Sequence, residues 1–335
     1  MRKMLNTLYI TTPEAYLALE DRNVVVLKEE NTLGRFPLHT LESIFYFGYR
    51  GASPALMGAC AEMEIGMCFL TPNGKFQARV CGETRGNVLL RKEQYRISDD
   101  ETRSCLVARN MIVGKVHNAH WLLQRATRDH PQRVDVEAIK QTCEGLKGTL
   151  SAIASCEALD TLRGLEGEAA ARYFGSLGQL VLQNAEFFTF KSRNRRPPLD
   201  PFNALLSFAY TLLSHDCKSA LEAVGLDPYV GFLHRDRPGR ASLALDLMEE
   251  MRGWVSERFV LTLINNRIVH PKHFHRSENR AVRLDHDGRK LVLAAWQERK
   301  RDEIQHPFLK EKIPWGLVPY AQATLLARHI RGDLE

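Results

Sequence analysis

Short apolar segments alternate with turn residues over the first eighty or so positions of the chain. The segments are rich in β-branched and aromatic residues, and Gly, Pro or Asn separates most of them. This pattern predicts five strands, at Thr7–Thr11, Val24–Lys28, Leu41–Phe47, Met67–Thr71 and Phe76–Val80. One helix is predicted among them, at Ser53–Glu64. It opens with Ser-Pro, which is typical of an N-cap followed by proline in the first turn.

From Gly86 onward, apolar residues recur at helical spacing in long segments. The pattern predicts helices at about 100–128, 134–156, 158–174, 178–190, 199–223, 241–266 and 320–331. The stretch 269–293 has no such period and is expected to be irregular or hairpin-like. The predicted fold class is therefore α+β, with a small β-rich N-terminal domain at residues 1–85 and a larger all-α domain at residues 86–335.

The composition is that of a soluble globular protein, with 44% hydrophobic and 26% charged residues among 335. No window approaches 18 uncharged apolar residues, and the first residues lack the apolar segment of a secretory signal, so we expect no membrane span. The seven cysteines form no C-x-x-C pair, which argues against a disulfide framework and favours a cytoplasmic location. The net charge of +6 permits an anionic partner without demanding one.

Two glutamates in the predicted helix 158–174 differ in their surroundings. Glu166 shares a face with Leu162 and Ala170, and Gly164 and Gly167 flank it, which allows another backbone to approach closely. Glu168 lies elsewhere and can pair with Arg172 one turn later. Glu166 is thus either a functional carboxylate or a partly exposed residue near a helix end.

A narrow polar stripe runs along the helix predicted from residue 241. It contains Asp246, Glu249 and Glu250, without an obvious lysine one turn away. Like charges at this spacing repel, so a bound cation would relieve the cost, although a solvated helix face explains the stripe as well. His234 lies in the loop just before this helix, and Arg235, Arg237 and Arg240 in the same loop would favour a nearby anion.

Two further clusters are candidate sites. The histidines at 270, 273 and 275 resemble a metal-binding tract in composition, but their spacing fits neither an H-E-x-x-H helix nor a structural zinc site. A basic run at residues 191–196 precedes a Pro-Pro break and is either a solvated linker or a phosphate contact. Its candidate nucleic-acid-binding residues are Arg193, Arg195 and Arg196, beside Arg235 and Arg237 of the histidine loop.

These residues lie in segments that resemble the CRISPR-associated integrase of spacer acquisition, the first of its two universal proteins, and most closely its subtype I-C branch. The resemblance runs over nearly the whole chain. Characteristic stretches include LNTLYITTPEAYLALEDRNVVVL, NRRPPLDPFNALLSFAYTLL, VGLDPYVGFLHRDRPGRASLALDLMEEMR and PYAQATLLARHIRGDLE.

The resemblance implies a metal site in the helical domain, made of a glutamate, a histidine and a second acid. Matched to the family's motifs, LEG supplies Glu166, GFLH supplies His234, and DLMEE supplies Glu249 with Asp246 in close support. Glu250 would replace Glu249 if the helix were rotated. The ligand types suit Mg²⁺ or Mn²⁺.

The implied activity is a metal-dependent DNA endonuclease and integrase that inserts short foreign fragments into a CRISPR array by phosphodiester transfer, for antiviral defence. The implied partners are DNA, the small second acquisition protein, and a second copy of the chain, joined largely through the β-rich domain. Three alternatives stay open: a nuclease or junction resolvase that never integrates, a nucleic-acid-binding scaffold without chemistry, and a hydrolase built on His270, His273 and His275.

Overall fold

The computed structural model describes residues 6–29, 31–72, 76–83 and 88–334, and the chain divides into two compact units. The first unit combines residues 1–85 with 289–318, and the second combines 86–288 with 319–335. The predicted boundary falls within residues 84–87, which lie outside the described residues. Residues 289–318 were predicted to belong to the helical domain, whereas the structure packs this segment with the β-rich unit.

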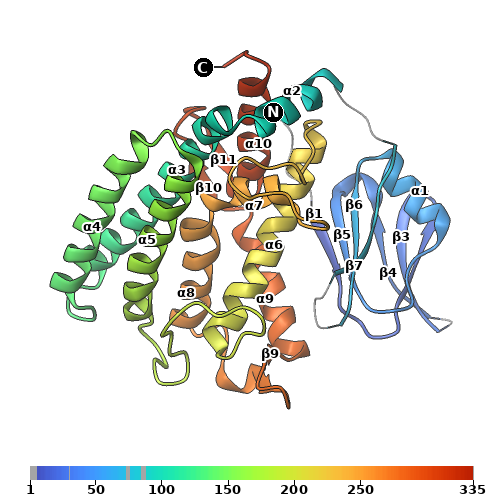
Figure 1. Ribbon diagram of the computed structural model, residues 1–335. Helices are drawn as coiled ribbons and strands as arrows, with labels where there is room; N and C mark the ends of the chain where they lie inside the picture. The colour runs from blue at the N-terminus through green and yellow to red at the C-terminus, as the bar shows by residue number, and fades with distance from the viewer. Residues whose placement is uncertain (1–5, 30, 73–75, 84–87, 335) are drawn as a thin grey trace. The chain divides into compact units, whose positions relative to one another are not determined.

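Two small sheets and one helix form the N-terminal part of the first unit (Figure 1). The larger sheet has the order β1-β5-β6-β7, with β7 antiparallel and the other pairs parallel. Its strands are β1 (Asn6–Ile10), β5 (Leu41–Phe47), β6 (Gly66–Leu70) and β7 (Phe76–Val80). The second sheet is an antiparallel meander of β2 (Tyr16–Glu20), β3 (Asn23–Lys28) and β4 (Asn31–Pro37).

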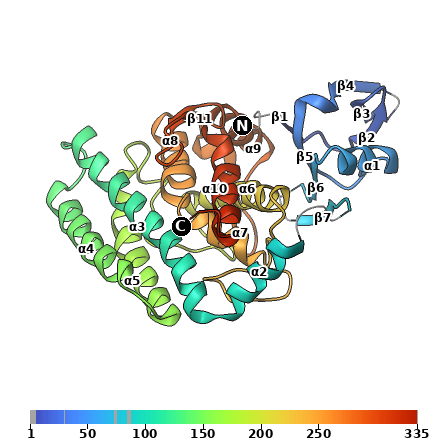
Figure 2. The same ribbon diagram turned by 90° about the horizontal axis from the view of Figure 1, so that it is seen from above.

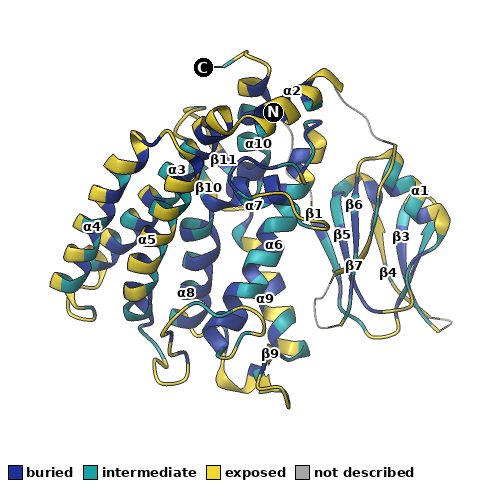
Figure 3. Ribbon diagram, viewed as in Figure 1, coloured by how far each residue is buried: buried dark blue, intermediate teal, exposed yellow. Residues whose placement is uncertain are grey.

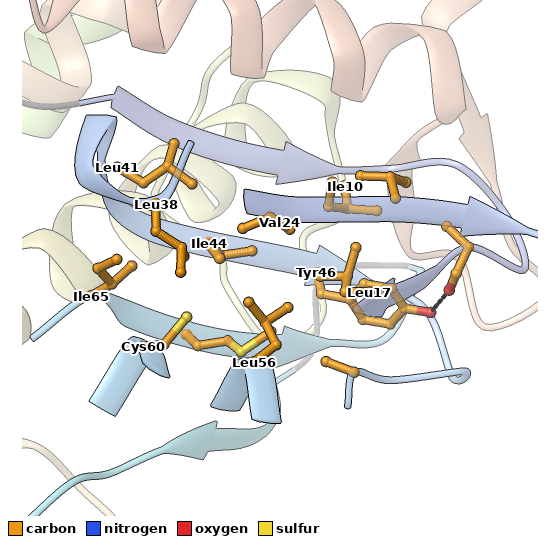
Figure 4. Packing of buried hydrophobic residues seen from close by; sticks show 14 residues of the cluster. Ile10, Leu17, Val24, Leu38, Leu41, Ile44, Tyr46, Leu56, Cys60 and Ile65 are labelled. Carbon is orange, nitrogen blue, oxygen red and sulfur yellow. Dashed lines mark hydrogen bonds between the residues drawn. The ribbon is translucent and has the colours of Figure 1, made fainter. Parts of the chain in front are cut away.

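The five predicted strands are present, but β2 and β4 were not predicted. Most residues of β4 are exposed, and Gly34 and Pro37 lie within it, so it lacks the apolar alternation that marks a half-buried strand. Apolar side chains from both sheets and from helix α1 (Pro54–Glu62) form one core, seen in Figure 4. Inside it the Tyr46 hydroxyl donates to the Ala15 carbonyl at 2.5 Å.

The C-terminal segment of the first unit adds strands β10 (Glu303–Gln305) and β11 (Lys312–Pro314), which pair antiparallel. Trp296 and Trp315 pack edge to face, with ring centroids 5.1 Å apart. The Lys300 ammonium, only 1% exposed, lies 3.0 Å from a carboxylate oxygen of Glu42 in β5. This buried ion pair joins the late segment to the N-terminal sheet, and the aromatic pair stabilises the segment itself.

The second unit is helical, with α3, α4 and α5 side by side in Figures 1 and 2. Its helices are α2 (Val88–Asp99), α3 (Glu101–Asp129), α4 (Val136–Ala154), α5 (Leu159–Leu177), α6 (Pro201–Ala223), α7 (Ser242–Glu249), α8 (Arg258–Asn265) and α10 (Val318–Ile330). Aspartate side chains cap α3, α4 and α6 by accepting backbone N–H groups of the first turn. Figure 3 shows exposed residues on α4 and α5 and extensive burial on α7 and α8.

Helix α2 was not predicted, and three further stretches differ from the prediction. The predicted helix 178–190 is wrong: only a 3₁₀ turn at Gly178–Leu180 forms, and coil follows it. The predicted helix 241–266 is α7 and α8 with a π-helical segment, Arg252–Glu257, between them. The irregular stretch contains the hairpin β8 (Phe274–Arg276) and β9 (Val282–Leu284), and then helix α9 (His286–Arg299). None of the helices within the described residues combines the length and hydropathy needed to cross a bilayer.

We predict that Lys300→Met lowers the free energy of unfolding of the first unit by about 3 kcal/mol, because it leaves the Glu42 carboxylate without its buried partner. Urea unfolding followed by tryptophan fluorescence measures the change. Arg35→Met is the control, since it removes an exposed pair with Glu20 and should cost less than about 1 kcal/mol. Equal losses in the two variants would show that the Lys300 pair does not anchor the segment.

Candidate metal and phosphate site in the helical unit

A buried aspartate on α7 fixes the loop that carries the candidate histidine. Asp246 is 0% exposed, and its carboxylate accepts the backbone N–H groups of Phe232, Leu233 and His234 at 2.6, 2.9 and 3.0 Å. Gly231 opens this turn, and a Cβ there would lie 2.7 Å from the same carboxylate, so no larger residue fits. The sequence and the backbone together thus bring the loop onto α7.

The same carboxylate orients the imidazole. Nδ1 of His234 lies 2.5 Å from Asp246 Oδ1, which makes Nδ1 the donor and leaves Nε2 as the free acceptor. Nε2 lies 4.0 Å from Oε1 of Glu249, which follows Asp246 by about one turn of α7. A carboxylate that holds one nitrogen of a histidine while the other nitrogen is free is the usual support of a metal-ligating histidine.

Helix α5 also holds the loop. Arg163 donates from Nε and Nη2 to the carbonyl oxygen of Leu233, at 3.0 and 2.9 Å. It lies three residues before Glu166, so a single stretch of α5 positions both the loop and the candidate carboxylate. Arg163 was not predicted from the sequence, because nothing in its local pattern distinguishes it from an ordinary helix-surface arginine.

Lys115 of α3 lies between the two candidate glutamates. Its ammonium is 2.7 Å from Oε2 of Glu249 and forms a short ion pair with Oε1 of Glu166. Its side chain is 14% exposed, against 26% for Glu166 and 3% for Glu249. The structure therefore brings Glu166 and Glu249 together around one ammonium, and His234 lies beside Glu249.

Buried charges set the protonation states here. Burial by itself would raise the pKa of Glu249, but the charges of Arg252 and Lys115 outweigh it and lower the pKa to about 2. Burial would lower the pKa of Lys115, yet the Glu249 and Glu166 carboxylates raise it above its ordinary value. The Glu249–Lys115 contact is thus a pair of full charges at neutral pH.

The acidic stripe differs from the sequence interpretation in two respects. It is not a solvated face, because Asp246 and Glu249 are buried. The stripe has no lysine one turn away, as the sequence shows, but it does have a basic partner: Arg252, three residues after Glu249, donates to it at 2.8 Å. Glu250 points elsewhere and accepts from the Gln322 side chain of α10 at 2.5 Å, so the fallback to Glu250 has no geometric support.

The π-helical segment carries a second buried carboxylate close to the first. Glu257 accepts the hydroxyls of Tyr173 on α5 and Tyr210 on α6. The ring of Tyr210 also lies under the guanidinium of Arg252, 5.1 Å from its centroid. This network joins α5, α6 and the π-helical segment next to Glu249.

The candidate DNA-binding arginines fall into different environments. The guanidinium of Arg193 is engaged inside the unit, where it donates to Asn203 and Ser207 and stacks on Tyr210 at 5.3 Å. In contrast, Arg195 and Arg196 are not enclosed in this way, and both reach the surface.

The histidine loop contributes two exposed arginines. Arg235 pairs with Asp160 at 3.0 Å, and Asp160 also pairs with Arg163. Arg237 is exposed as well. The positive charge of this loop therefore lies at the surface, beside the buried site.

The residues at the Glu166–Glu249 position fit a divalent ion in donor chemistry. Two ligand atoms that are each about 2.1 Å from one ion lie at most about 4.2 Å apart. The 4.0 Å between His234 Nε2 and Glu249 Oε1 is within that limit. Among the described residues, no three acidic or imidazole side chains are arranged to hold a metal ion. The Lys115 ammonium occupies the space between the two carboxylates.

The histidine tract offers a poorer fit. Nδ1 of His273 accepts the backbone N–H of His270 at 3.1 Å, so this ring stabilises a turn. His273 is only 6% exposed, whereas His270 and His275 are exposed. We find no geometric support for the hydrolase alternative there.

Comparison with known proteins identifies the family. A family model described as CRISPR associated protein Cas1 matches residues 8–298. A CRISPR-associated endonuclease Cas1 of Rhodospirillum rubrum is 51% identical, and the match covers 100% of this chain and 98% of the relative. A second, from Chlorobaculum tepidum, is 45% identical with the same coverage. The chain therefore belongs to the Cas1 family.

Solved structures show the same fold. A casposase bound to an integration product has a TM-score of 0.85 at 22% identity, over 99% of this chain and 92% of that one. A Cas1 protein from Thermotoga maritima has a TM-score of 0.81 at 21% identity, over 97% of each chain. The mixed α+β architecture with a β-rich N-terminal region is thus that of Cas1 structures.

We predict a pH-dependent contribution from Glu257, whose pKa is raised chiefly by burial. The folded state holds this proton more tightly than the unfolded chain does. The stabilisation is complete below the ordinary carboxyl pKa of about 4.3 and is lost as pH rises through the higher folded value. Glu257→Gln should therefore make the decline in unfolding free energy above that pH shallower, measured by urea unfolding at stepped pH.

The control for this prediction is Glu144→Gln on α4. A hydrogen bond from Lys147 lowers the pKa of Glu144, so its stabilisation is present at higher pH and is lost as pH falls. Removing it should change the slope in the opposite sense, and weakly, because the pair is exposed. A Glu257→Gln slope equal to that of the wild type would contradict the assignment.

Proposed function

We propose that this chain is a divalent-metal-dependent DNA endonuclease and integrase that joins short foreign DNA fragments to a CRISPR array. One observation carries the proposal: the Lys115 ammonium contacts both Glu166 of α5 and Glu249 of α7, and Nε2 of His234 lies 4.0 Å from the other oxygen of Glu249. The relatives named CRISPR-associated endonucleases support the nuclease part. The casposase with its integration product supports the strand-transfer part.

In this proposal Glu166, His234 Nε2 and Glu249 hold Mg²⁺ or Mn²⁺. When bound, the ion neutralises charge on a phosphate oxygen and lowers the pKa of an attacking hydroxyl or water. Asp246 holds the imidazole in the tautomer whose Nε2 has a free lone pair, and Arg163 fixes the loop against α5. Arg252 keeps one oxygen of Glu249 in place, so the carboxylate orientation is set before substrate arrives.

The partners follow from the same comparisons. The structural neighbours include a complex titled Cas6-RT-Cas1–Cas2, which supports a small second acquisition protein as partner. Pairing of two chains through the β-rich unit, a cytoplasmic location and the subtype I-C assignment belong to the proposal as the sequence resemblance implies them. A nuclease without integration is the second candidate, because the same ligands serve water and a 3′-hydroxyl equally.

A strand-transfer assay separates these two candidates. The proposal predicts that the protein, with its small partner and Mn²⁺, joins a labelled DNA fragment to a plasmid that carries a CRISPR repeat. Cleavage of the same DNA without any joined product would support the nuclease or resolvase alternative. Binding without cleavage or joining would support the scaffold.

We predict that Glu166→Gln lowers both cleavage and joining by more than roughly 100-fold, since the loss of a residue that merely supports a ligand costs about 10–100-fold. Glu168→Gln is the matched control on the same helix, because Glu168 is exposed and pairs with Arg172, at 2.9 Å. It should leave both rates within about twofold of the wild type. Similar losses in the two variants would remove Glu166 from the site.

We predict that Arg195→Ala with Arg196→Ala weakens DNA binding and lowers its salt slope by roughly 0.9 for every phosphate that the variant no longer neutralises. The rate at saturating DNA should stay unchanged, because such arginines position the DNA backbone. Arg125→Ala with Arg128→Ala removes the same charge from the end of α3 and serves as the control. Unchanged affinity at low and moderate salt would show that residues 195 and 196 form a solvated linker.

A further inference from the structure

We propose that Lys115 is a resident counter-ion of the metal site: its ammonium holds the Glu166 and Glu249 carboxylates together before metal binds, and it must withdraw when metal binds. The inference rests on the proposed function, because it takes these two glutamates as metal ligands. It assigns to Lys115 a positioning role that limits metal affinity.

The charge balance around the carboxylates supports this role. Glu166 and Glu249 carry two negative charges, and Lys115 and Arg252 bring two positive charges within contact distance. The charges of these four groups therefore balance without any metal. A divalent ion added beside an unmoved ammonium would leave an excess of positive charge in a poorly solvated position, where like charges repel strongly.

The ammonium also lies where an ion between the two carboxylates would bind. Each glutamate has an oxygen directed at Nζ of Lys115, and these are oxygens that an ion between the two carboxylates would use. The lysine comes from α3, a different helix from either ligand, so its removal leaves the backbone that carries the ligands unchanged. Metal and ammonium thus compete for the same two oxygens.

A small pocket beside the site could receive the Lys115 ammonium after it leaves the carboxylates. Lys115 itself lines the pocket, together with Arg252, Tyr173 and Glu257. The Glu257 carboxylate is the acidic group of this pocket, held there by the Tyr173 and Tyr210 hydroxyls. A change of side-chain rotamer would carry the Lys115 ammonium from the ligand carboxylates toward Glu257.

The test measures metal affinity and the stability of the metal-free protein, with no need for DNA. Lys115→Met keeps an unbranched side chain and removes the charge. We expect its metal-free melting temperature to fall, because the two carboxylates lose their shared partner. We expect Mn²⁺ to bind at least about tenfold more tightly in calorimetry and to restore the melting temperature.

Two control variants complete the experiment. Lys147→Met removes an exposed lysine paired with Glu144 and should change neither quantity. Lys115→Arg keeps the charge, so its Mn²⁺ affinity should not rise. Lys115→Gln removes the charge, so its Mn²⁺ affinity should rise as that of Lys115→Met does. The proposal holds if both neutral variants bind Mn²⁺ more tightly than the wild type or, where Lys115→Met folds only with Mn²⁺, if Lys115→Gln binds it more tightly than the wild type.

Mn²⁺ affinity that is unchanged or weaker in both neutral variants would overturn the role of Lys115. That outcome is distinguishable from failure of the proposed function. If wild-type protein binds Mn²⁺, Glu166→Gln abolishes the binding and the neutral Lys115 variants bind no more tightly, the metal site is supported and the role of Lys115 is contradicted. If Glu166→Gln binds Mn²⁺ as the wild type does, the ligand assignment itself falls, and the inference falls with it.

Discussion

Four carboxylates inside the helical unit must each be paired or hydrogen-bonded, and this requirement fixes the side chains around them. Asp246, Glu249 and Glu257 are buried, and Glu166 is largely so. A buried charge is tolerated only when it is paired or accepts several hydrogen bonds. The structure satisfies the four carboxylates in three different ways, and these differences decide what each carboxylate does.

Asp246 accepts three backbone N–H groups and the imidazole N–H, so both of its oxygens hold the loop and orient the histidine. Glu257 takes two tyrosine hydroxyls and joins neighbouring helices. Glu166 and Glu249 share an ammonium, which is a mobile partner on a flexible stem. Two carboxylates are therefore committed to structure, and two are paired in a way that another cation can replace.

The π-helical segment after α7 contributes to this division. It begins at Arg252 and ends at Glu257; Arg252 pairs with Glu249, and Glu257 is itself the carboxylate that the tyrosines hold. Wider helical turns of this kind occur frequently at functional sites. An ordinary helix through residues 241–266, as the sequence predicts, would place these two side chains at a different angle from α7.

Local patterns in the sequence predicted much of the fold. Apolar periodicity predicted α3 to α6, and runs of β-branched and aromatic residues between turn residues predicted the five strands. The predicted helix 178–190 failed because its aromatic residues are buried without a helix: Phe188 packs against Phe274, and Phe190 packs against Phe202. The packing of residues 289–318 with the first unit depends on Lys300 and Glu42, which are 258 positions apart.

The candidate site was predictable only in its acidic and imidazole members. Helix faces and spacing marked Glu166, His234 and the acidic stripe as candidates, and the family resemblance selected the ligands among them. Lys115 did leave one signal in the sequence. It interrupts the apolar stripe of α3 between Met111 and Ala119, both buried, and a lone lysine there needs a buried acid as partner. No local pattern shows which acids those are, since Glu166 and Glu249 lie far along the chain, the nearer of them 51 positions away.

The central claim is that Glu166, His234 and Glu249 hold one divalent ion. Anomalous diffraction at the manganese edge from crystals grown with Mn²⁺ tests it most directly. The account predicts one strong peak about 2.0–2.3 Å from a carboxylate oxygen of each glutamate and from Nε2 of the histidine, with the Lys115 ammonium no longer between the carboxylates. A peak only at His270, His273 and His275, or none beside Glu166 and Glu249, would contradict it.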